Sequence, residues 1–218
     1  MFVKPDLSRL IEITFGKAWF RIDDDIVKAM EPLQSTLARA QNAVRFAWFS
    51  DANAEVMHCT KLEAVRVRAG FFRAALAEFV SMEDVLKIDL ESLGNAKPAL
   101  RLNESPNPIL HMFRELRNYE IHLKQSPFSH KERDMLWGHI KNPADASPLR
   151  ISIWILDGIS LESFSQLANA KRYTREELCK FVDWLNQEQA EWGIQQLFLN
   201  AVEDYCRELI QAFLSNRR

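Results

Sequence analysis

The chain contains little glycine, few cysteines and almost no net charge, and each shortage excludes a class of protein. Only six of its 218 residues are glycine, and they are scattered, so the sequence offers no glycine-rich loop of the kind that cradles phosphate. The three cysteines, Cys59, Cys179 and Cys206, are an odd number and include no close pair. This pattern argues against a disulfide framework or a zinc site, favours reduced thiols, and leaves no cofactor expected.

Charge and hydropathy narrow the class further. The formal net charge is −2 and the isoelectric point is about 6.2, so no overall basic field marks a nucleic-acid binder. A protein of this charge that acts on RNA would need a local basic patch. No uninterrupted apolar run is long enough to cross a bilayer, and charges and Pro5 interrupt the region where a signal peptide would be apolar. We therefore expect a cytoplasmic protein without a membrane partner.

Hydrophobic residues, in contrast, are plentiful. They make up 47% of the chain and include six Trp and fourteen Phe, which would be costly to leave exposed to water. This is enough for a substantial core in a chain whose length fits one domain. We expect residues 1–218 to form a single helical domain.

Two long helices and a short one are predicted before residue 105. The first has apolar residues at alternating steps of three and four, a face suited to burial that consists of Leu33, Leu37, Ala40, Val44, Ala47 and Trp48. Pro32 either begins this helix or kinks a longer one that starts near residue 26. The second covers about residues 54–80, and Ser81 with Asp84 resembles a capping box that opens a short helix at 82–92.

The N-terminal residues allow more than one interpretation. Residues 1–22 form either a hairpin turned at Gly16 and Lys17, which we favour, or a short helix capped by Asp6. Three acidic residues follow at 23–25. They could ligate a hard cation, but acidic residues just before a helix complement its positive end, and this second interpretation is favoured.

Residues 125–172 differ in character and are expected to be an insert between a central helix at 107–124 and the C-terminal helices. Residues 135–140 form a short apolar run, and residues 149–155 alternate between apolar and polar, as in a half-buried strand. The two segments could pair as a hairpin across 141–148. The insert could serve as a lid, a dimer arm or an unrelated elaboration.

The last part of the chain is predicted to be helical. Thr174 and Glu177 form a capping box, and Gly193 either kinks or divides the helical region that follows. Together with the earlier helices, this predicts a mainly α protein, an up-and-down helical bundle with a small β-hairpin.

The central helix at 107–124 carries the most informative sequence, NPILHMFRELRNYEIHLK. Asn107 can cap its N-terminus, and proline fits the first helical position because no hydrogen bond is lost there. An apolar stripe is formed by Ile109, Phe113, Leu116 and Leu123. Arg117 and Glu120 fall inside or beside this stripe, where a charge is costly unless it is paired or faces a cleft.

Arg117, the polar Asn118 after it and His122, within an amphipathic helix of an all-α chain, resemble the Arg–x4–His signature of the HEPN superfamily. The resemblance covers residues 117–122, and the surrounding helices only by type. It implies a HEPN-like bundle and metal-independent cleavage of RNA by attack of a ribose 2′-hydroxyl on the adjacent phosphate. It also implies a homodimer whose motifs face one cleft, a toxin or phage-defence role, and an antitoxin or other protein partner.

The residue types suit these roles. His122 titrates near neutral pH and can move a proton, whereas Arg117 is permanently charged and forked, which suits charge that develops on phosphate oxygens. Asn118, the third candidate catalytic residue, could orient the imidazole or bind phosphate. The candidate substrate-binding residues are Arg114, Tyr119 and Arg66, the last from a basic flank that also includes Lys61, Arg68 and Arg73. That flank is either a phosphate-contacting strip or a solvated face.

The same residues have other interpretations. On an ideal helix Arg117 and His122 lie about 140° apart, so they share a site only through side-chain length, an irregular helix or a second subunit. Alternatively, Glu120 pairs with Arg117 or Arg114, and His122 is an ordinary surface residue. The protein would then be a non-catalytic HEPN-like binding or dimerisation module, or a structural helical protein with an accidental match.

Metal and thiol chemistry are less favoured. His111 and Glu115 lie one turn apart and could present two ligands, but no second helix supplies the carboxylate and histidine that a di-metal bundle needs. No metal is therefore expected. Cys179 and Cys206 lie in helical stretches and resemble core residues rather than nucleophiles.

Overall fold

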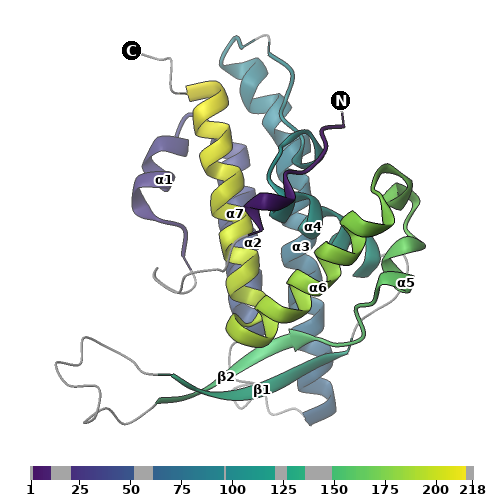
Figure 1. Ribbon diagram of the computed structural model, residues 1–218. Coiled ribbons are helices and arrows are strands. Elements are labelled where there is room, and N and C mark those ends of the chain that lie inside the picture. The colour runs from purple at the N-terminus through teal and green to yellow at the C-terminus, as the bar shows by residue number, and fades with distance from the viewer. Residues whose placement is uncertain are drawn as a thin grey trace, which may run out of the picture.

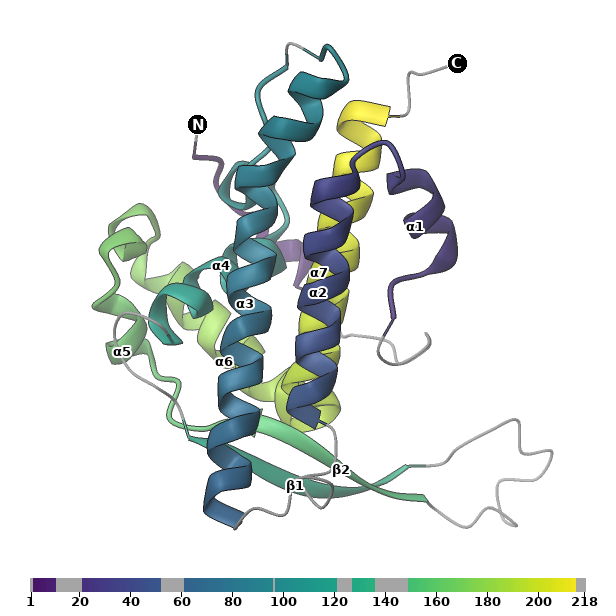
Figure 2. The ribbon, with the colours of Figure 1, turned by 180° about the vertical axis from the view of Figure 1, so that it is seen from behind.

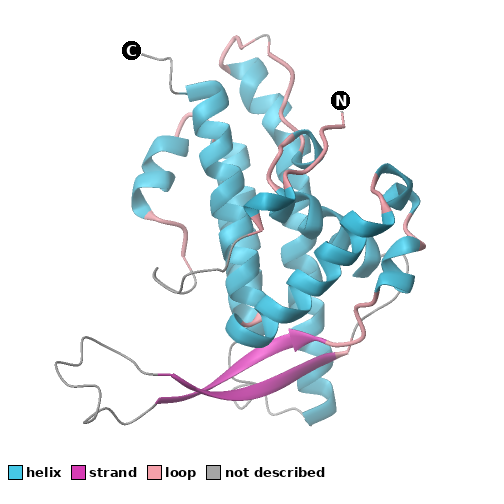
Figure 3. Cartoon of the chain, viewed as in Figure 1, coloured by secondary structure: helices cyan, strands magenta, loops and turns pink. Residues whose placement is uncertain are grey.

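The computed structural model describes residues 2–10, 21–51, 61–95, 97–120, 127–135 and 149–214. These residues form seven α-helices, three short 3-10 helices, a π-helical element at Ile210–Leu214 and one antiparallel pair of strands (Figures 1 and 3). The elements are α1 (Asp24–Met30), α2 (Gln34–Asp51), α3 (Lys61–Ser92), α4 (Pro108–Asn118), β1 (Phe128–Met135), β2 (Leu149–Leu156), α5 (Leu161–Ser165), α6 (Arg175–Trp192) and α7 (Ile194–Leu209). The expected class, a mainly α helical bundle with a small β-hairpin, is confirmed.

Three long helices form the body of the molecule. Figures 1 and 2 show α2, α3 and α7 side by side, with α1 on one side of them and α4, α5 and α6 on the other. The hairpin crosses the long helices near one end, where β1 contacts α3 and β2 contacts α6 and α7. None of the described helices is both long enough and apolar enough to span a membrane.

The core is a connected cluster of buried apolar side chains to which every α-helix contributes. At its centre Phe198 of α7 meets Phe72 and Phe79 of α3 and Phe113 of α4 edge to face, with ring centroids 5.4 to 5.7 Å apart. Edge-to-face contacts are favoured because the positive edge of one ring meets the negative face of the next. This packing fixes α4, the helix that carries the candidate motif, against α3 and α7.

The region around Pro32 divides two helices. α1 ends at Met30 and α2 begins at Gln34, so the proline lies between them. Asp23 caps α1, because its side chain accepts a hydrogen bond of 2.9 Å from the backbone N–H of Asp25. The acidic residues therefore lie at the positive end of a helix, as the favoured interpretation predicted.

The predicted short helix at 82–92 is wrong, because α3 continues without a break to Ser92. Ser81 does not cap a new helix. Its hydroxyl donates to the carbonyl of Ala77 at 2.7 Å, one turn earlier in the same helix. The buried face continues through Met82, Leu86 and Leu90, and burial of these side chains outweighs the local capping pattern.

The hairpin is confirmed for its second strand and corrected for its first. β2 covers the predicted alternating segment, but its partner is Phe128–Met135 rather than 135–140, with Phe128 opposite Leu156 and Met135 opposite Leu149. β1 is mostly polar, and its Phe128 is buried against the core. A strand of this composition lacks a hydrophobic period, and pairing with β2 decides its place. Residues 136–148 lie outside the described part.

Local signals at both ends of the chain are clear. Asp6 caps a 3-10 helix at Leu7–Arg9, which supports the helical alternative there, while the hairpin turn favoured at Gly16 lies outside the described residues. The capping box of Thr174 and Glu177 opens α6, and Gly193 separates α6 from α7. Both C-terminal predictions are confirmed.

Candidate functional site

α4 is anchored at its N-terminus as its sequence predicts. The Asn107 side chain accepts from the N–H of Ile109 at 3.1 Å, and its amide nitrogen donates to Asp204 of α7 at 2.9 Å. Pro108 occupies the first turn. Eight of the eleven residues of α4 are buried, so its polar side chains must find partners inside the protein.

Arg117 and Asn118 end this helix as a hydrogen-bonded pair. Both are half-buried, and Arg117 Nη1 donates to Asn118 Oδ1 at 3.3 Å, slightly longer than the usual range. Asn118 in turn donates from Nδ2 to Glu115 Oε2 at 3.3 Å. The structure therefore brings two of the three candidate catalytic residues together at the partly exposed end of α4.

The helix changes its geometry directly after this pair. The backbone N–H of Tyr119 is shared between the carbonyls of Glu115 and Leu116, and residues 119–120 are π-helical. An angle of about 140° calculated for an ideal α-helix therefore does not describe the segment between Arg117 and His122. His122, the third candidate catalytic residue, lies outside the described residues.

Glu115 is the shared hydrogen-bond acceptor of the polar groups in this region. The sequence suggested it only as a metal ligand. Glu115 is 3% exposed, and its carboxylate accepts from Asn118 and from Asn169 Nδ2, at 3.2 Å to Oε1. Burial raises the pKa of Glu115, while the hydrogen bond from Asn118, the charge of Arg114 and the hydrogen bond from Asn169 oppose that shift. Asn169 lies 54 positions from Glu115, and no local pattern indicates this contact.

Arg114, an expected substrate-binding residue, is engaged by two carboxylates. Its Nε lies 3.3 Å from Glu83 of α3 and its Nη1 lies 3.5 Å from Glu115, and its side chain is 18% exposed. Glu83 also accepts from the backbone N–H of Leu102 at 2.7 Å. A phosphate could bind Arg114 only in competition with both carboxylates.

Tyr119, also expected to bind substrate, lies in the core. Its side chain is fully buried, and its ring is almost parallel to that of Phe164 on α5, with centroids 5.3 Å apart and an angle of 24°. This position does not support the expected contact with a substrate. The ring instead fixes the end of α4 against α5.

The three arginines of the basic flank of α3 lie in three different environments. Arg66 is exposed, whereas Arg68 is buried over the ring of Trp154, 4.1 Å from its centroid. Arg73 pairs with Glu120, with 3.3 Å between Nε and Oε2. Glu120 was expected to pair with an arginine such as Arg117 or Arg114, and α3 supplies Arg73 as a partner from another helix. The three arginines do not form a continuous exposed strip.

His111 has a structural environment. It is fully buried, with Nδ1 2.9 Å from the Tyr173 hydroxyl and Nε2 2.7 Å from the Ser105 carbonyl. Burial lowers the pKa of His111, so the ring is neutral, donates from Nε2 and accepts at Nδ1. Both ring nitrogens are engaged, and among the described residues no group of acidic, His and Cys side chains could hold a metal ion.

The two described cysteines do not have the surroundings of nucleophiles. Burial raises the pKa of Cys206 to about 12. Cys179 is half-buried and donates to Asp183 at 3.3 Å, a contact that raises the pKa of Cys179. Neither thiol is therefore activated as a thiolate. Cys59 lies outside the described residues.

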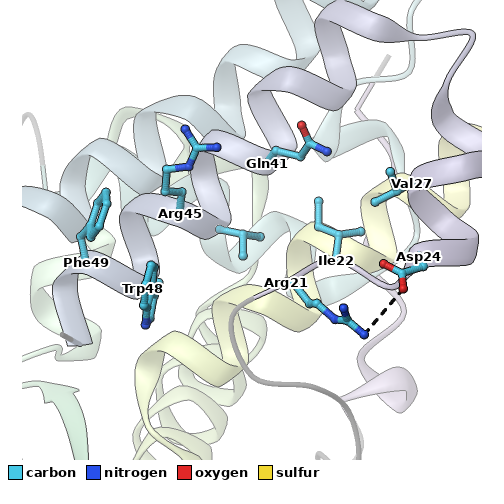
Figure 4. A pocket seen from close by; sticks show the side chains of 9 residues that line it. Arg21, Ile22, Asp24, Val27, Gln41, Arg45, Trp48 and Phe49 are labelled. Carbon is cyan, nitrogen blue, oxygen red and sulfur yellow. Dashed lines mark ion pairs between the residues drawn. The ribbon is translucent and has the colours of Figure 1, made fainter.

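A pocket of about 510 Å³ lies between α1 and α2 (Figure 4). Arg21 is 3.6 Å from Asp24, and Figure 4 shows it pointing toward that carboxylate. The guanidinium of Arg45 points away from both. The charged groups of this pocket do not converge on one point, so it does not present a ready site for a phosphate or a carboxylate.

No protein-family model, curated protein or solved structure matches this chain. The resemblance to the HEPN superfamily therefore depends on residues 117–122 and on the helical architecture. The described residues add one structural observation. The guanidinium of Arg117 and the amide of Asn118 are oriented by a hydrogen bond at the end of α4, and His122 follows them in the sequence.

Proposed function

We propose that this protein is a metal-independent endoribonuclease of the HEPN-like type, with Arg117, Asn118 and His122 as its candidate catalytic residues. The observation that carries the proposal is the Arg117–Asn118 pair. Both residues are half-buried, and Asn118 also donates a hydrogen bond to Glu115. A forked cation in a fixed orientation suits the charge that accumulates on a phosphate during cleavage. Such a pair at the end of a buried helix is preorganised.

The reaction proposed uses only groups of the protein and the RNA. The ribose 2′-oxygen forms a bond to the adjacent phosphorus and loses its proton, while the bond from phosphorus to the 5′-oxygen of the next nucleotide breaks. The leaving oxygen takes up a proton, and the products are a 2′,3′-cyclic phosphate and a 5′-hydroxyl. His122 would transfer one of these protons near neutral pH, and Arg117 would bind the phosphate oxygens.

The biological setting follows from the resemblance. We infer a homodimer in which two motifs face one cleft, a toxin or phage-defence role, and an antitoxin or other protein as a further partner. RNA contacts at Arg66 and Arg114 belong to the same proposal. Arg66 is the better placed of the two because it is exposed, whereas Arg114 is engaged by carboxylates.

The test is cleavage of RNA by purified protein in the presence of EDTA. Arg117→Ala and His122→Ala should each abolish cleavage and leave the melting temperature nearly unchanged. Matched controls are Arg101→Ala and His130→Ala, which remove an exposed arginine and an exposed histidine outside the motif. Cleavage that requires added metal, or that survives both motif substitutions, would contradict the proposal.

A non-catalytic binding or dimerisation module is the second candidate, and a separate observation favours it. Trp48 and Phe49 on α2 are 45% and 37% exposed, and their rings are almost parallel with centroids 5.5 Å apart. Exposed aromatic surface of this kind is typical of protein interfaces. This candidate predicts that Trp48→Ala weakens self-association measured by analytical ultracentrifugation, and that no variant or wild-type protein cuts RNA.

A further inference from the structure

We propose that Glu115 and Asn169 are positioning residues of the candidate nuclease site, which fix the side chain of Asn118 and, through it, the guanidinium of Arg117. What this implies for RNA cleavage rests on the proposed function. The orientation of Asn118 does not depend on it and can be measured separately.

Hydrogen-bond donation runs in one direction, from the guanidinium of Arg117 through the amide of Asn118 to the carboxylate of Glu115. Glu115 accepts from the amide nitrogen of Asn118, and the amide oxygen of Asn118 accepts from Arg117, each at 3.3 Å. An asparagine amide can rotate and exchange its oxygen with its nitrogen, but a carboxylate only accepts hydrogen bonds. Glu115 therefore selects the orientation that presents oxygen to Arg117. In the rotated orientation an N–H group would face the guanidinium.

Glu115 is itself held by a second element of the fold. Glu115 is 3% exposed, and a buried carboxylate needs donors to offset the loss of water. Asn169 Nδ2 lies 3.2 Å from Oε1 and 3.4 Å from Oε2. Arg114 is a second neighbour at 3.5 Å, but Glu83 also engages it. Asn169 is thus a hydrogen-bond donor that reaches Glu115 from outside α4.

The segment around Asn169 is fastened to α4 on both sides. Asn169 belongs to the 3-10 helix Ala168–Arg172, within the segment predicted as an insert. Before it, Phe164 stacks on Tyr119, and after it, the Tyr173 hydroxyl contacts His111. Figures 1 and 2 both show α5 on the side of the molecule that carries α4. This part of the insert therefore packs against α4 and contributes a side chain, Asn169, to the surroundings of the candidate site.

The experiment compares Asn169→Ala and Asn169→Asp with the control Asn186→Ala. Asn186 donates to the carbonyl of Ile159 at 3.2 Å, so it fastens the same segment to α6 without a link to Asn118. The first measurement is the 15N NMR signal of the Asn118 side-chain amide, assigned by its loss in Asn118→Ser. Both Asn169 substitutions should shift or broaden this signal, and Asn186→Ala should leave it in place.

The second measurement is the rate of RNA cleavage at saturating RNA. Asn169→Ala should lower it about 10-fold, because the guanidinium loses its fixed orientation, whereas the half-saturating RNA concentration should change less. Asn186→Ala should retain the wild-type rate. An unchanged Asn118 signal in both Asn169 variants would overturn the inference, as would a shifted signal with undiminished cleavage. If wild-type protein cuts no RNA, the proposed function fails alone, and the Asn118 signal still decides the orientation.

Discussion

Arg73 on α3 and Glu120, two residues beyond the end of α4, form an ion pair with 3.3 Å between Nε and Oε2. Glu83 and Arg114 form a second pair between the same segments at 3.3 Å, with the charges exchanged. α3 supplies the cation in the first pair and the carboxylate in the second. Sliding α4 along α3 would separate both pairs, so together they define the register of the motif helix.

Removing Arg73 should destabilise the protein, because Glu120 is 1% exposed and would lose a charged partner. We expect Arg73→Met to lower the free energy of unfolding by about 2 to 3 kcal/mol, below the cost for a fully buried pair because Arg73 is 20% exposed. Urea denaturation measures this. Arg66→Met removes an exposed arginine from the same helix and should change stability by less than about 0.5 kcal/mol. Equal effects of the two would contradict a role for the pair.

Asp89 on α3 should stabilise the N-terminus of α2 as a capping residue within α2 would. Its carboxylate accepts from the backbone N–H groups of Ser35 and Thr36 at 3.2 and 2.8 Å, and from the Thr36 hydroxyl at 2.8 Å. These N–H groups lie in the first turn of α2, where no intrahelical acceptor exists. Asp89→Ala should therefore cost about 2 kcal/mol in thermal unfolding. Asp84→Ala, an exposed site on α3, should be almost neutral.

Two glycines should respond to alanine in opposite directions. Gly193 has a φ of 81°, and a Cβ there would lie 3.3 Å from Cβ of Ile153. Gly193→Ala should lower stability by about 1 to 3 kcal/mol through backbone strain and crowding against β2. Gly70 lies inside α3 with open space around it, so Gly70→Ala should raise stability by about 0.5 to 1 kcal/mol. The measurement is the denaturation midpoint, which should be lower than wild type for Gly193→Ala and higher than wild type for Gly70→Ala.

The buried imidazole of His111 should make stability depend on pH. Burial lowers the pKa of His111 below its ordinary value of 6.5, against a raising effect of the Ser105 carbonyl. The unfolded chain then binds a proton that the folded chain does not, so this contribution is complete above pH 6.5 and is lost as the pH falls below it.

His111→Gln should remove this slope between about pH 7 and about pH 5, measured by urea denaturation at each pH. His130→Gln, at an exposed position on β1, should keep the wild-type slope. The comparison concerns slopes, because removing the buried ring also lowers stability at every pH. A slope that survives in His111→Gln would show that another group causes it.

The sequence by itself determined features that depend on residues within one helical turn. Asn107 with Pro108 predicted the start of α4, Thr174 with Glu177 predicted the start of α6, and Gly193 predicted the break before α7. The strand β2 was predicted from the alternation of apolar and polar residues along it. In each case the hydrogen bond or the exclusion of water acts between near neighbours in the chain.

Only the tertiary structure decided the contacts between distant positions. Arg73 and Glu120 lie 47 positions apart, and Glu115 and Asn169 lie 54 apart, so their pairing follows from how α3, α4 and the 3-10 helix pack. The polar strand β1 is defined by its pairing with β2. α3 continues past the capping pattern at Ser81 because its buried face continues. A local pattern sets which hydrogen bonds a residue can make, but burial selects which partner removes the cost of leaving water.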